Sequence, residues 1–462
     1  MRKFALLLTV LASALSLKAA VAEPVRPNVL FIAIDDLRPE LGCYGDPVAQ
    51  TPHLDKLAGE GALFERAYCQ VAVCGASRAS MMTGILPTKT RFVDYLATVD
   101  GDAPGAATLA QVFKEAGYTT LVNGKIFHNS RDTAERSWSE KPRGTGLNHR
   151  TSHDPQTNQT TTQQGNGLFF ECVAVPDDAY TDGRVAARTI EDLRRFKDSG
   201  EPFFIGCGFI RPHLPFYAPK KYWDLYDANA IPLASYRDRP RNAPDALSGS
   251  GEYRTYFLGD YDAQSEAFHR KMRHGYLAST SYVDKLVGDV LNELDALGLA
   301  DNTIVVVWGD HGFHLGEYNF WGKHNTMHLA TRIPLIVKAP GKLQGLRSEA
   351  LISSVDIFPT LCALAGIETP ASVQGKSFVA SLSDKDATSN AVVYTRFKSA
   401  DAIVTPRFNY TRYENGEEML YDLKIDPGET LNRVSNPEYK ATLAKLRILL
   451  QEQIEIAESA PF

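Results

Sequence analysis

The sequence predicts a layered α/β fold followed by a smaller C-terminal α+β subdomain. Three observations predict it: continuous apolar runs that end in polar residues, helical patterns between these runs, and a change of pattern near residue 374. The apolar, β-rich runs cover residues 28–34, 118–122, 202–207 and 303–308. Runs without polar alternation are typical of strands that are buried on both faces, as in a parallel sheet.

Helical patterns separate these strands. Thr51 and Pro52 supply an N-cap and a first-turn proline for one helix. Apolar residues at helical spacing predict a second helix over 185–196 and a longer one over about 268–297. Strands that alternate with helices indicate a layered sheet, whose functional residues gather at the carboxyl ends of the strands.

The pattern changes from about Gln374. Short strand-like pieces at 391–394, 402–405 and 409–413 precede a helix that starts after Asn436-Pro437 and carries leucines on one face: Leu443, Leu446 and Leu450. Short strands followed by one helix predict a small α+β unit with an antiparallel sheet.

The N-terminus has the pattern of a secretory signal. Arg2 and Lys3 begin it, residues 4–17 form an apolar stretch, and residues 20–22 give an A-x-A cleavage site. The stretch is too short to span a membrane comfortably, and no cysteine follows the cleavage site to carry a lipid. We therefore expect an exported protein, periplasmic or secreted, without a membrane anchor.

Together these boundaries divide the chain into three parts. A signal peptide covers residues 1–22, a main α/β domain covers 23–373, and the C-terminal subdomain, with a small antiparallel sheet and a terminal helix, covers 374–462.

Charge and cysteine usage exclude several classes of protein. A net charge of -6 without any basic run of five or more residues argues against a nucleic-acid partner. An anionic substrate would therefore have to meet a local cationic pocket.

The six cysteines are scattered without a C-x-x-C pair, which argues against a zinc knuckle and a dense disulfide scaffold. Their pairing is not readable from the sequence.

The sharpest local pattern is Cys74-Gly75-Ala76-Ser77-Arg78. It resembles the sulfatase signature, in which Cys or Ser is followed two residues later by Pro or Ala and four residues later by Arg. Taken alone, the pentapeptide is equally compatible with a small buried cysteine beside a helix start.

Further motifs support the resemblance. In the same order along nearly the whole mature chain, they resemble the type I sulfatases and look closest to the iduronate-2-sulfatase branch. The motifs are Asp35-Asp36-Leu37-Arg38-Pro39, Gly124-Lys125-Ile126-Phe127-His128, Arg211-Pro212-His213-Leu214-Pro215, Gly309-Asp310-His311-Gly312-Phe313, Asp356-Ile357-Phe358-Pro359-Thr360 and Leu420-Tyr421-Asp422.

The resemblance implies an alkaline-phosphatase-like fold, in which a large mixed sheet is sandwiched by helices. It also implies that a maturation enzyme oxidises Cys74 to formylglycine. One hydroxyl of the hydrated aldehyde would attack sulfur, and deprotonation of the other would expel sulfate and regenerate the aldehyde. An ordinary serine would instead leave a sulfated enzyme that is hard to clear. If Cys74 is consumed in this way, at least one of the remaining five cysteines is unpaired.

A metal site is also implied, formed by Asp35, Asp36, Asp310 and His311 around the modified Cys74. Mostly hard oxygen ligands suit one Ca²⁺ ion. His311 departs from sulfatases with Asn at this position, although the iduronate-2-sulfatase branch shares it, and a nitrogen ligand suits softer metals. Taken singly, each acidic pair would more often be a surface pair at a strand end.

The remaining catalytic positions implied by the family are Arg78, Lys125, His128, His213 and Lys323. Fixed cations would stabilise the negative charge of a sulfuryl transition state. Arg78 would hold the aldehyde hydrate, and Lys125 and Lys323 would clamp sulfate oxygens. His128 would orient or deprotonate the hydrate and His213 would protonate the leaving oxygen, although the residues alone leave this division open.

The resemblance also implies a substrate, a 2-sulfated uronate within a glycosaminoglycan or an algal polysaccharide. Phe313 replaces the Trp of that branch, and Arg396 or Lys398 would meet the carboxylate of the sugar. Two rival functions stay open: a phosphonate monoester or phosphodiester hydrolase of the same superfamily, and an inactive relative that binds polysaccharide. A serine hydrolase is disfavoured because the chain has no G-x-S-x-G motif.

Overall fold

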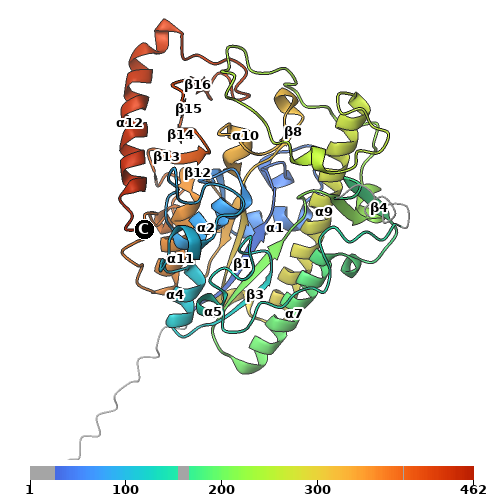
Figure 1. Ribbon diagram of the computed structural model, residues 1–462. Helices are drawn as coiled ribbons and strands as arrows, with labels where there is room; N and C mark the ends of the chain where they lie inside the picture. The colour runs from blue at the N-terminus through green and yellow to red at the C-terminus, as the bar shows by residue number, and fades with distance from the viewer. Residues whose placement is uncertain (1–25, 155–165, 389) are drawn as a thin grey trace, which may run out of the picture.

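A mixed sheet forms the centre of the molecule, with helices on both faces (Figure 1). The computed structural model describes residues 26–154, 166–388 and 390–462, so the predicted signal peptide lies outside the described residues. Within that part of the chain the sheet has eight strands in the order β10-β2-β11-β7-β1-β5-β3, with β12 beside β2. They are β1 (Asn28–Ile34), β2 (Ala62–Tyr68), β3 (Thr119–Gly124), β5 (Phe203–Phe209), β7 (Thr303–Gly309), β10 (Arg332–Ile333), β11 (Leu335–Lys338) and β12 (Leu346–Ser353).

The four apolar runs of the sequence are the parallel strands β3, β5, β1 and β7. Every residue of β1, β5 and β7 is buried, as runs without polar alternation predict. The register pairs Ile34 of β1 with Phe209 of β5 and with Gly309 of β7. Because parallel strands in this register end together, the residues that follow them emerge at one edge of the sheet.

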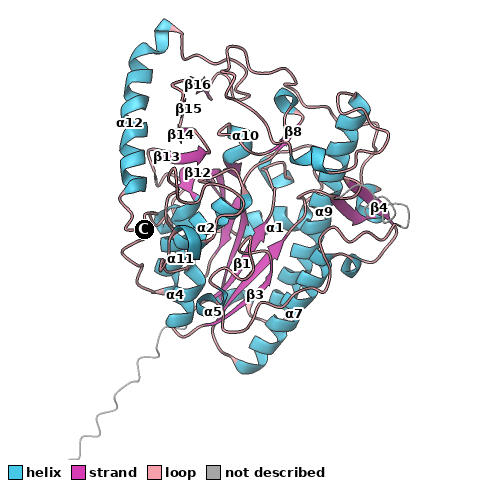
Figure 2. Cartoon of the chain, viewed as in Figure 1, coloured by secondary structure: helices cyan, strands magenta, loops and turns pink. Residues whose placement is uncertain are grey.

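One face of the sheet is covered by α1 (Pro52–Glu60), α7 (Thr181–Ser199) and α9 (Glu266–Ala296). These are the three helices that the sequence predicts between the strands, and their presence is confirmed. The opposite face is covered by α2 (Cys74–Thr83), α4 (Leu109–Glu115) and α11 (Ile357–Ala365). Figure 2 shows the strands passing between these two layers of helices.

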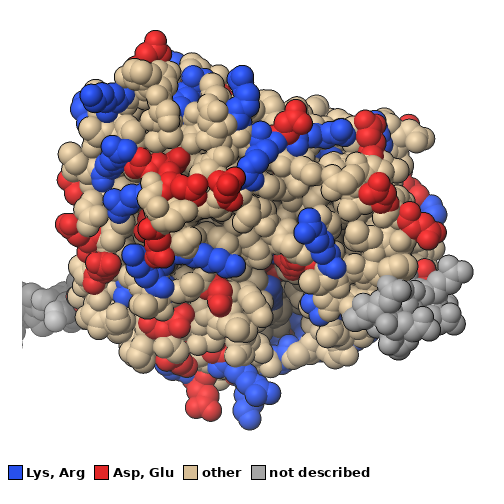
Figure 3. All heavy atoms as spheres, turned by 45° about the horizontal axis from the view of Figure 1, so that its top comes forward, with Lys and Arg blue, Asp and Glu red and all other residues tan. Residues whose placement is uncertain are grey.

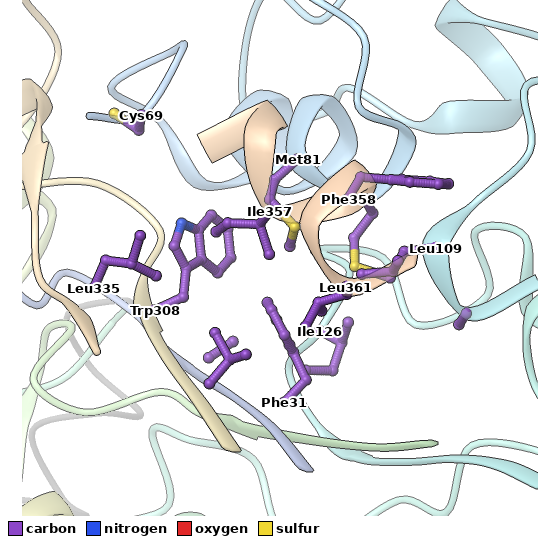
Figure 4. Packing of buried hydrophobic residues seen from close by; sticks show 14 of the residues in the cluster. Phe31, Cys69, Met81, Leu109, Ile126, Trp308, Leu335, Ile357, Phe358 and Leu361 are labelled. Carbon is purple, nitrogen blue, oxygen red and sulfur yellow. The ribbon is translucent and has the colours of Figure 1, made fainter. Parts of the chain in front are cut away.

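The core alternates between the two faces along each strand. In β1, Phe31 packs toward α2 and α11, whereas Leu30 and Ile32 pack toward α7 and α9. Figure 4 shows Phe31, Trp308 and Leu361 pointing into the same space, and the rings of Phe31 and Trp308 lie 6.0 Å apart. This packing fixes α2, and therefore Cys74 at its first position, against the sheet.

The C-terminal subdomain consists of a four-stranded antiparallel sheet and one long helix. The strands are β13 (Val393–Phe397), β14 (Ala400–Val404), β15 (Phe408–Tyr413) and β16 (Glu418–Asp422), paired in that order. The helix α12 (Lys440–Glu458) buries the three predicted leucines against Ile403, Tyr410 and Leu420. The predicted small sheet and terminal helix are confirmed, whereas the boundary at 373/374 stays a prediction.

Shorter elements connect these layers. The short strands are β4 (Phe170–Val173), β6 (Phe216–Pro219), β8 (His314–Leu315) and β9 (Trp321–Gly322), and the short α-helices are α3 (Val99–Asp102), α5 (Ala134–Ser137), α8 (Lys220–Trp223) and α10 (His328–Thr331). Single 3₁₀ turns lie at Gly42–Tyr44, Asp177–Ala179, Glu252–Thr255, Ala300–Asn302, Glu317–Asn319, Ser354–Asp356, Val379–Leu382 and Pro437–Tyr439.

Two further properties of the described residues complete the fold. None of the helices in the described ranges is both long and apolar enough to cross a bilayer. The cysteines at 43, 69, 74, 172, 207 and 362 are all free thiols in the structure.

Candidate active site

Cys74 lies at the N-terminal end of α2, where every residue of the helix is buried. Gly75 follows it because a Cβ at that position would lie 2.2 Å from the carbonyl oxygen of Tyr95. The Ser77 hydroxyl donates to the carbonyl oxygen of Asp310, which ties this helix to the end of β7. The signature residues therefore bring the Cys74 thiol to the carboxyl edge of the sheet.

Three strands deliver charged residues to the same edge. The sheet pairing continues one residue past each strand, since the backbone N–H groups of Asp35, Lys125 and Asp310 donate to Phe209, Gly208 and Ile34 at 3.2, 2.9 and 3.3 Å. Asp36 then turns away with a φ of 59°, and its carbonyl accepts from the Tyr276 hydroxyl at 2.8 Å. The left-handed backbone at Asp36 directs this second carboxylate into the site.

Several buried polar atoms here have no partner. They are the donor atom Arg78 Nη2 and three possible ligand atoms: Asp35 Oδ1, Asp36 Oδ2 and His311 Nε2. The ligand atoms of Asp35, Cys74 and His311 lie within 4.8 Å of one another. His311 Nδ1 donates to the Gly312 carbonyl at 3.0 Å, which leaves the lone pair of Nε2 free to bind an ion. Because unpaired buried carboxylate oxygens are costly, this donor set fits a divalent cation.

Cations pair with each of the acidic residues. Arg78 Nε donates to Asp310 Oδ2 at 2.8 Å, Lys125 Nζ to Asp35 Oδ2 at 2.5 Å, and Lys323 Nζ to Asp36 Oδ1 at 2.8 Å. Arg78 also donates to the backbone carbonyls of Lys125 and Ile126, so its guanidinium is held on several sides. All seven predicted charged and nucleophilic groups of this edge therefore form one buried cluster, which we call the acid–cation cluster: Asp35, Asp36, Cys74, Arg78, Lys125, Asp310 and Lys323.

The cluster changes the acidity of its members. Burial by itself would raise the pKa of Asp35, but Lys125, His213 and Arg78 outweigh it and hold this pKa well below its usual value. Burial would also raise the pKa of the Cys74 thiol, and Lys125, His128 and His311 together lower it well below the usual value. A thiol in such surroundings is chemically reactive, in contrast to a structural buried cysteine such as Cys69, whose pKa burial raises.

The two histidines lie at different places around Cys74. His128 Nδ1 lies 3.1 Å from Cys74 Sγ. His213 Nε2 instead lies 3.1 Å from Glu252 Oε1, and its Nδ1 donates to the Leu214 carbonyl. Burial would lower the pKa of His213, but Asp36 and Glu252 outweigh it and raise this pKa to about 9. The raised pKa favours the protonated imidazole, the form that a proton donor requires.

Glu252 is a site residue that the sequence reasoning missed. Its two oxygens reach His213 Nε2 at 3.1 Å and Lys323 Nζ at 2.9 Å, so it joins the two residues. It lies in a single 3₁₀ turn between irregular segments, where no strand or helix pattern points to it. Only the contacts reveal its position.

A cavity of about 830 Å³ opens above the cluster. Its lining includes Cys74, Lys125, His128, His213 and Lys323 from the predicted set, together with Glu252 and His324. On the face of the molecule in Figure 3, acidic and basic side chains are interspersed. An anionic ligand would accordingly be met by the cavity itself.

The structure does not bring all predicted substrate-binding residues into this cavity. Phe313 is 0% exposed and stacks on Tyr276, with ring centroids 5.6 Å apart. Arg396 is 1% exposed in β13, and its Nε pairs with Asp401 Oδ1 at 3.0 Å. Both are packed into the protein, so the expectation that they touch a sugar is not supported by their positions.

Lys398 lies outside the cavity lining but close to it. It is exposed, and its Nζ lies 5.5 Å from the ring centroid of Phe397. Phe397 in turn stacks on His324, a cavity residue, with ring centroids 5.2 Å apart and planes 7° apart. Lys398 is thus two side chains away from the cavity wall.

Comparison with known proteins gives a consistent result. The profile of the sulfatase family matches residues 27–367, and that of the C-terminal region of N-sulphoglucosamine sulphohydrolase matches residues 316–456. Iduronate 2-sulfatase of Mus musculus is 34% identical over 387 residues, which cover 74% of this chain and 69% of the relative. A delta 4,5-hexuronate-2-O-sulfatase of Bacteroides thetaiotaomicron is 29% identical over 473 residues, 94% of this chain and 90% of the relative.

The fold is also shared with solved structures. One, in complex with its substrate D-glucosamine-2-N,6-O-disulfate, superposes with a TM-score of 0.74 at 23% identity over 94% of this chain and 99% of the other. The expected alkaline-phosphatase-like architecture, a large mixed sheet with helices and a small C-terminal sheet, is confirmed. The chain belongs to the sulfatase family and is a sulfuric ester hydrolase.

Proposed function

We propose that this protein removes the sulfate ester from a 2-O-sulfated uronate, using a formylglycine that a maturation enzyme makes from Cys74. The observation that carries the proposal is the position of Cys74 Sγ, at the floor of the cavity and among reactive and charged groups. When formed, the hydrated aldehyde supplies one hydroxyl to attack sulfur and a second whose deprotonation releases sulfate.

The partnerless oxygens beside Cys74 support a metal. Asp35, Asp36, Asp310 and His311 would hold one ion, and three carboxylates make the set rich in hard oxygen ligands, as Ca²⁺ prefers. A bound Ca²⁺ would act as a Lewis acid on a sulfate oxygen and on the attacking hydroxyl.

The cations of the cluster have separate tasks in this proposal. Arg78, fully buried and held by Asp310 and two carbonyls, is a fixed positive charge behind residue 74. Lys125 and Lys323 line the cavity and would bind the sulfate oxygens. Because these charges are already in place before the reaction, they stabilise the transition state without reorganising.

The contacts favour one division of labour between the histidines. His128 is in hydrogen-bond reach of the atom at position 74, so it would orient the hydrate and take its proton. His213 lines the cavity and its raised pKa favours the protonated form, so it would protonate the leaving oxygen of the sugar.

The substrate and the place of action rest on other observations. Two relatives, named iduronate 2-sulfatase and delta 4,5-hexuronate-2-O-sulfatase, match 74% and 94% of this chain, which favours a uronate sulfated at O2. The source would be a glycosaminoglycan or an algal polysaccharide. The N-terminal sequence favours export to the periplasm or the medium.

Sulfate release from a panel of esters tests the proposal. Mature protein carrying the modified Cys74 and Ca²⁺ is assayed with a 2-O-sulfated uronate disaccharide, a 6-O-sulfated glucosamine, and matched aryl sulfate and aryl phosphate esters. We expect the highest kcat/KM with the sulfated uronate. A preference for the aryl phosphate would favour a phosphoesterase, and binding of the sugars without sulfate release would favour an inactive relative.

A further inference from the structure

The cavity is far larger than a sulfate group requires. Its volume of about 830 Å³ lies in the range of pockets that enclose whole small molecules, ~300–1,000 Å³. The acid–cation cluster occupies only its floor. The remaining walls would therefore contact the sugar. Their charges indicate which charged groups the sugar carries.

One wall carries an arginine without a counter-ion. Arg150 lines the cavity, and among the described residues no carboxylate forms an ion pair with it. Its Nη1 donates to Asn166 Oδ1 at 2.8 Å and its guanidinium lies over the ring of Tyr256 at 5.7 Å. Its Nε is buried and has no hydrogen-bond partner. Holding a guanidinium in place without a counter-ion costs free energy, unless a ligand supplies the missing anionic partner.

The neighbouring Arg143 shows the contrast. It lines the same wall, but its guanidinium pairs with Asp192, and its side chain is 38% exposed. Its charge is therefore already balanced and partly in solvent. Of the two arginines, Arg150 alone offers an uncommitted, sheltered donor to the cavity.

The electrostatic field at this wall is positive. His149 lies beside Arg150, and burial together with Arg211, His213 and Arg150 lowers its pKa to about 2. The charged groups with the largest effect on His149 are cationic, so an anion bound here would be attracted from several sides.

The same wall adjoins the proposed proton donor. The rings of His149 and His213 lie 6.1 Å apart in an edge-to-face arrangement. If His213 protonates the leaving oxygen, the group that contacts Arg150 belongs to the leaving sugar and not to the sulfate.

We propose that Arg150 binds the carboxylate of the uronate whose 2-O-sulfate is hydrolysed. This inference rests on the proposed function and adds a second anion site in the same cavity. Arg150 takes the role that the sequence assigned to Arg396, which is buried against Asp401. Its guanidinium, fixed by Asn166 and Tyr256, is preorganised for a charged hydrogen bond.

The test compares a 2-O-sulfated uronate disaccharide with its carboxyl-reduced form, in which the carboxylate becomes a hydroxymethyl group. With the mature, metal-loaded enzyme we expect kcat/KM to be roughly 10- to 100-fold higher for the uronate, the range for a hydrogen bond to a charged group. Arg150→Ala is expected to abolish this preference by lowering only the value for the uronate. Arg150→Lys, which keeps the charge, is expected to retain part of it.

Arg143→Ala is the matched control, because it removes a charge from the same wall. We expect it to retain the preference for the uronate over the carboxyl-reduced sugar. If Arg150→Ala lowers kcat/KM equally with both substrates, Arg150 has a structural role and does not bind the carboxylate, and the proposal is overturned. A wild-type enzyme that does not discriminate between the substrates would overturn it without any variant. Failure of the wild type to release sulfate from either sugar, while it hydrolyses another sulfate ester, would refute the proposed uronate substrate itself.

Discussion

Two buried clusters of charge follow the same strand, and they are built on opposite principles. The acid–cation cluster begins directly after β1 at Asp35, whereas a second cluster begins three residues later at Arg38. We call the second the Arg–Glu cluster; it consists of Arg38, Glu40, Arg273 and Glu317, each at most 7% exposed.

In the Arg–Glu cluster every carboxylate oxygen has a partner. Glu40 accepts from Arg38 Nε at 2.6 Å and from Arg273 Nη2 at 2.8 Å. Glu317 accepts from Arg38 Nη1 at 3.0 Å and from the Leu315 N–H at 2.6 Å. In the acid–cation cluster, one oxygen of Asp35 and one of Asp36 have none, and neither has Nε2 of the adjacent His311. Burial of charge is thus common to both, and the carboxylate oxygens distinguish them: two lack a partner in the ligand site, whereas in the structural support the unpartnered atom is a donor, Arg273 Nε.

The largest expected effect removes the nucleophile. Cys74→Ala is expected to lower kcat by at least about 10⁴-fold, because a covalent mechanism loses its reacting atom. Thermal unfolding should change little, since the side chain becomes smaller by one atom at the cavity floor. Sulfate release and melting temperature are the measurements. Retained turnover would show that the residue serves packing.

Loss of the metal is expected to have the next largest effect on turnover. Chelation should lower kcat by about 10²- to 10³-fold, the scale for removing one electrostatic contact to the transition state, and added Ca²⁺ should restore it. Asp36→Asn should weaken calorimetric Ca²⁺ affinity by at least about 10-fold, since even outer-shell changes cost that factor. Glu317→Gln is the control from the Arg–Glu cluster and should bind Ca²⁺ normally. Equal weakening in both variants would erase the distinction between the clusters.

Glu252 joins the acid–cation cluster to the proposed proton donor. Glu252→Gln removes the charge that holds His213 and Lys323 together. We expect about a 10- to 100-fold loss of kcat with a sugar sulfate, which needs a protonated leaving group, within the range for general acid catalysis. With 4-nitrophenyl sulfate, whose leaving group needs no proton, the loss should be within about threefold by the same reasoning. An equal loss with both esters would mean that Glu252 acts on binding or folding.

The last expected effect is on stability in acid, not on turnover, and belongs to the Arg–Glu cluster. Burial would raise the pKa of Glu317, but Arg38 and Arg273 outweigh it and lower this pKa from 4.5 to about 2. A lowered folded-state pKa contributes stability above pH 4.5, which is lost as the pH falls toward 2. The contribution is roughly 3 kcal/mol. Acid unfolding of Glu317→Gln should therefore depend less on pH in that window than wild type, starting from a lower stability at pH 7.

Much of the molecule follows from its sequence because its strongest signals are periodic. The apolar runs that became β1, β5 and β7 are buried along their whole length, and parallel register alone brings Asp35, Lys125 and Asp310 to one edge. Apolar spacing likewise predicts α9, which runs over Glu266–Ala296.

Individual side-chain contacts could not be predicted from the sequence in the same way. Arg396 was expected at the substrate, but its strand places it opposite Asp401, which neutralises it. Glu252 was missed because its role depends on two residues brought near by folding. Arg150 lies in a segment without periodicity, and its significance is an unpaired atom that only a three-dimensional environment defines.

The mass of the peptide that contains Cys74, taken from fully active enzyme, tests the central claim most directly. Replacement of CH₂SH by CHO lowers the mass by about 18 Da, and the covalent mechanism requires that aldehyde. Across preparations of different activity, we expect the fraction of molecules that show this deficit to rise in proportion to the apparent kcat. Full activity from protein whose residue 74 is entirely an unmodified thiol would contradict the account.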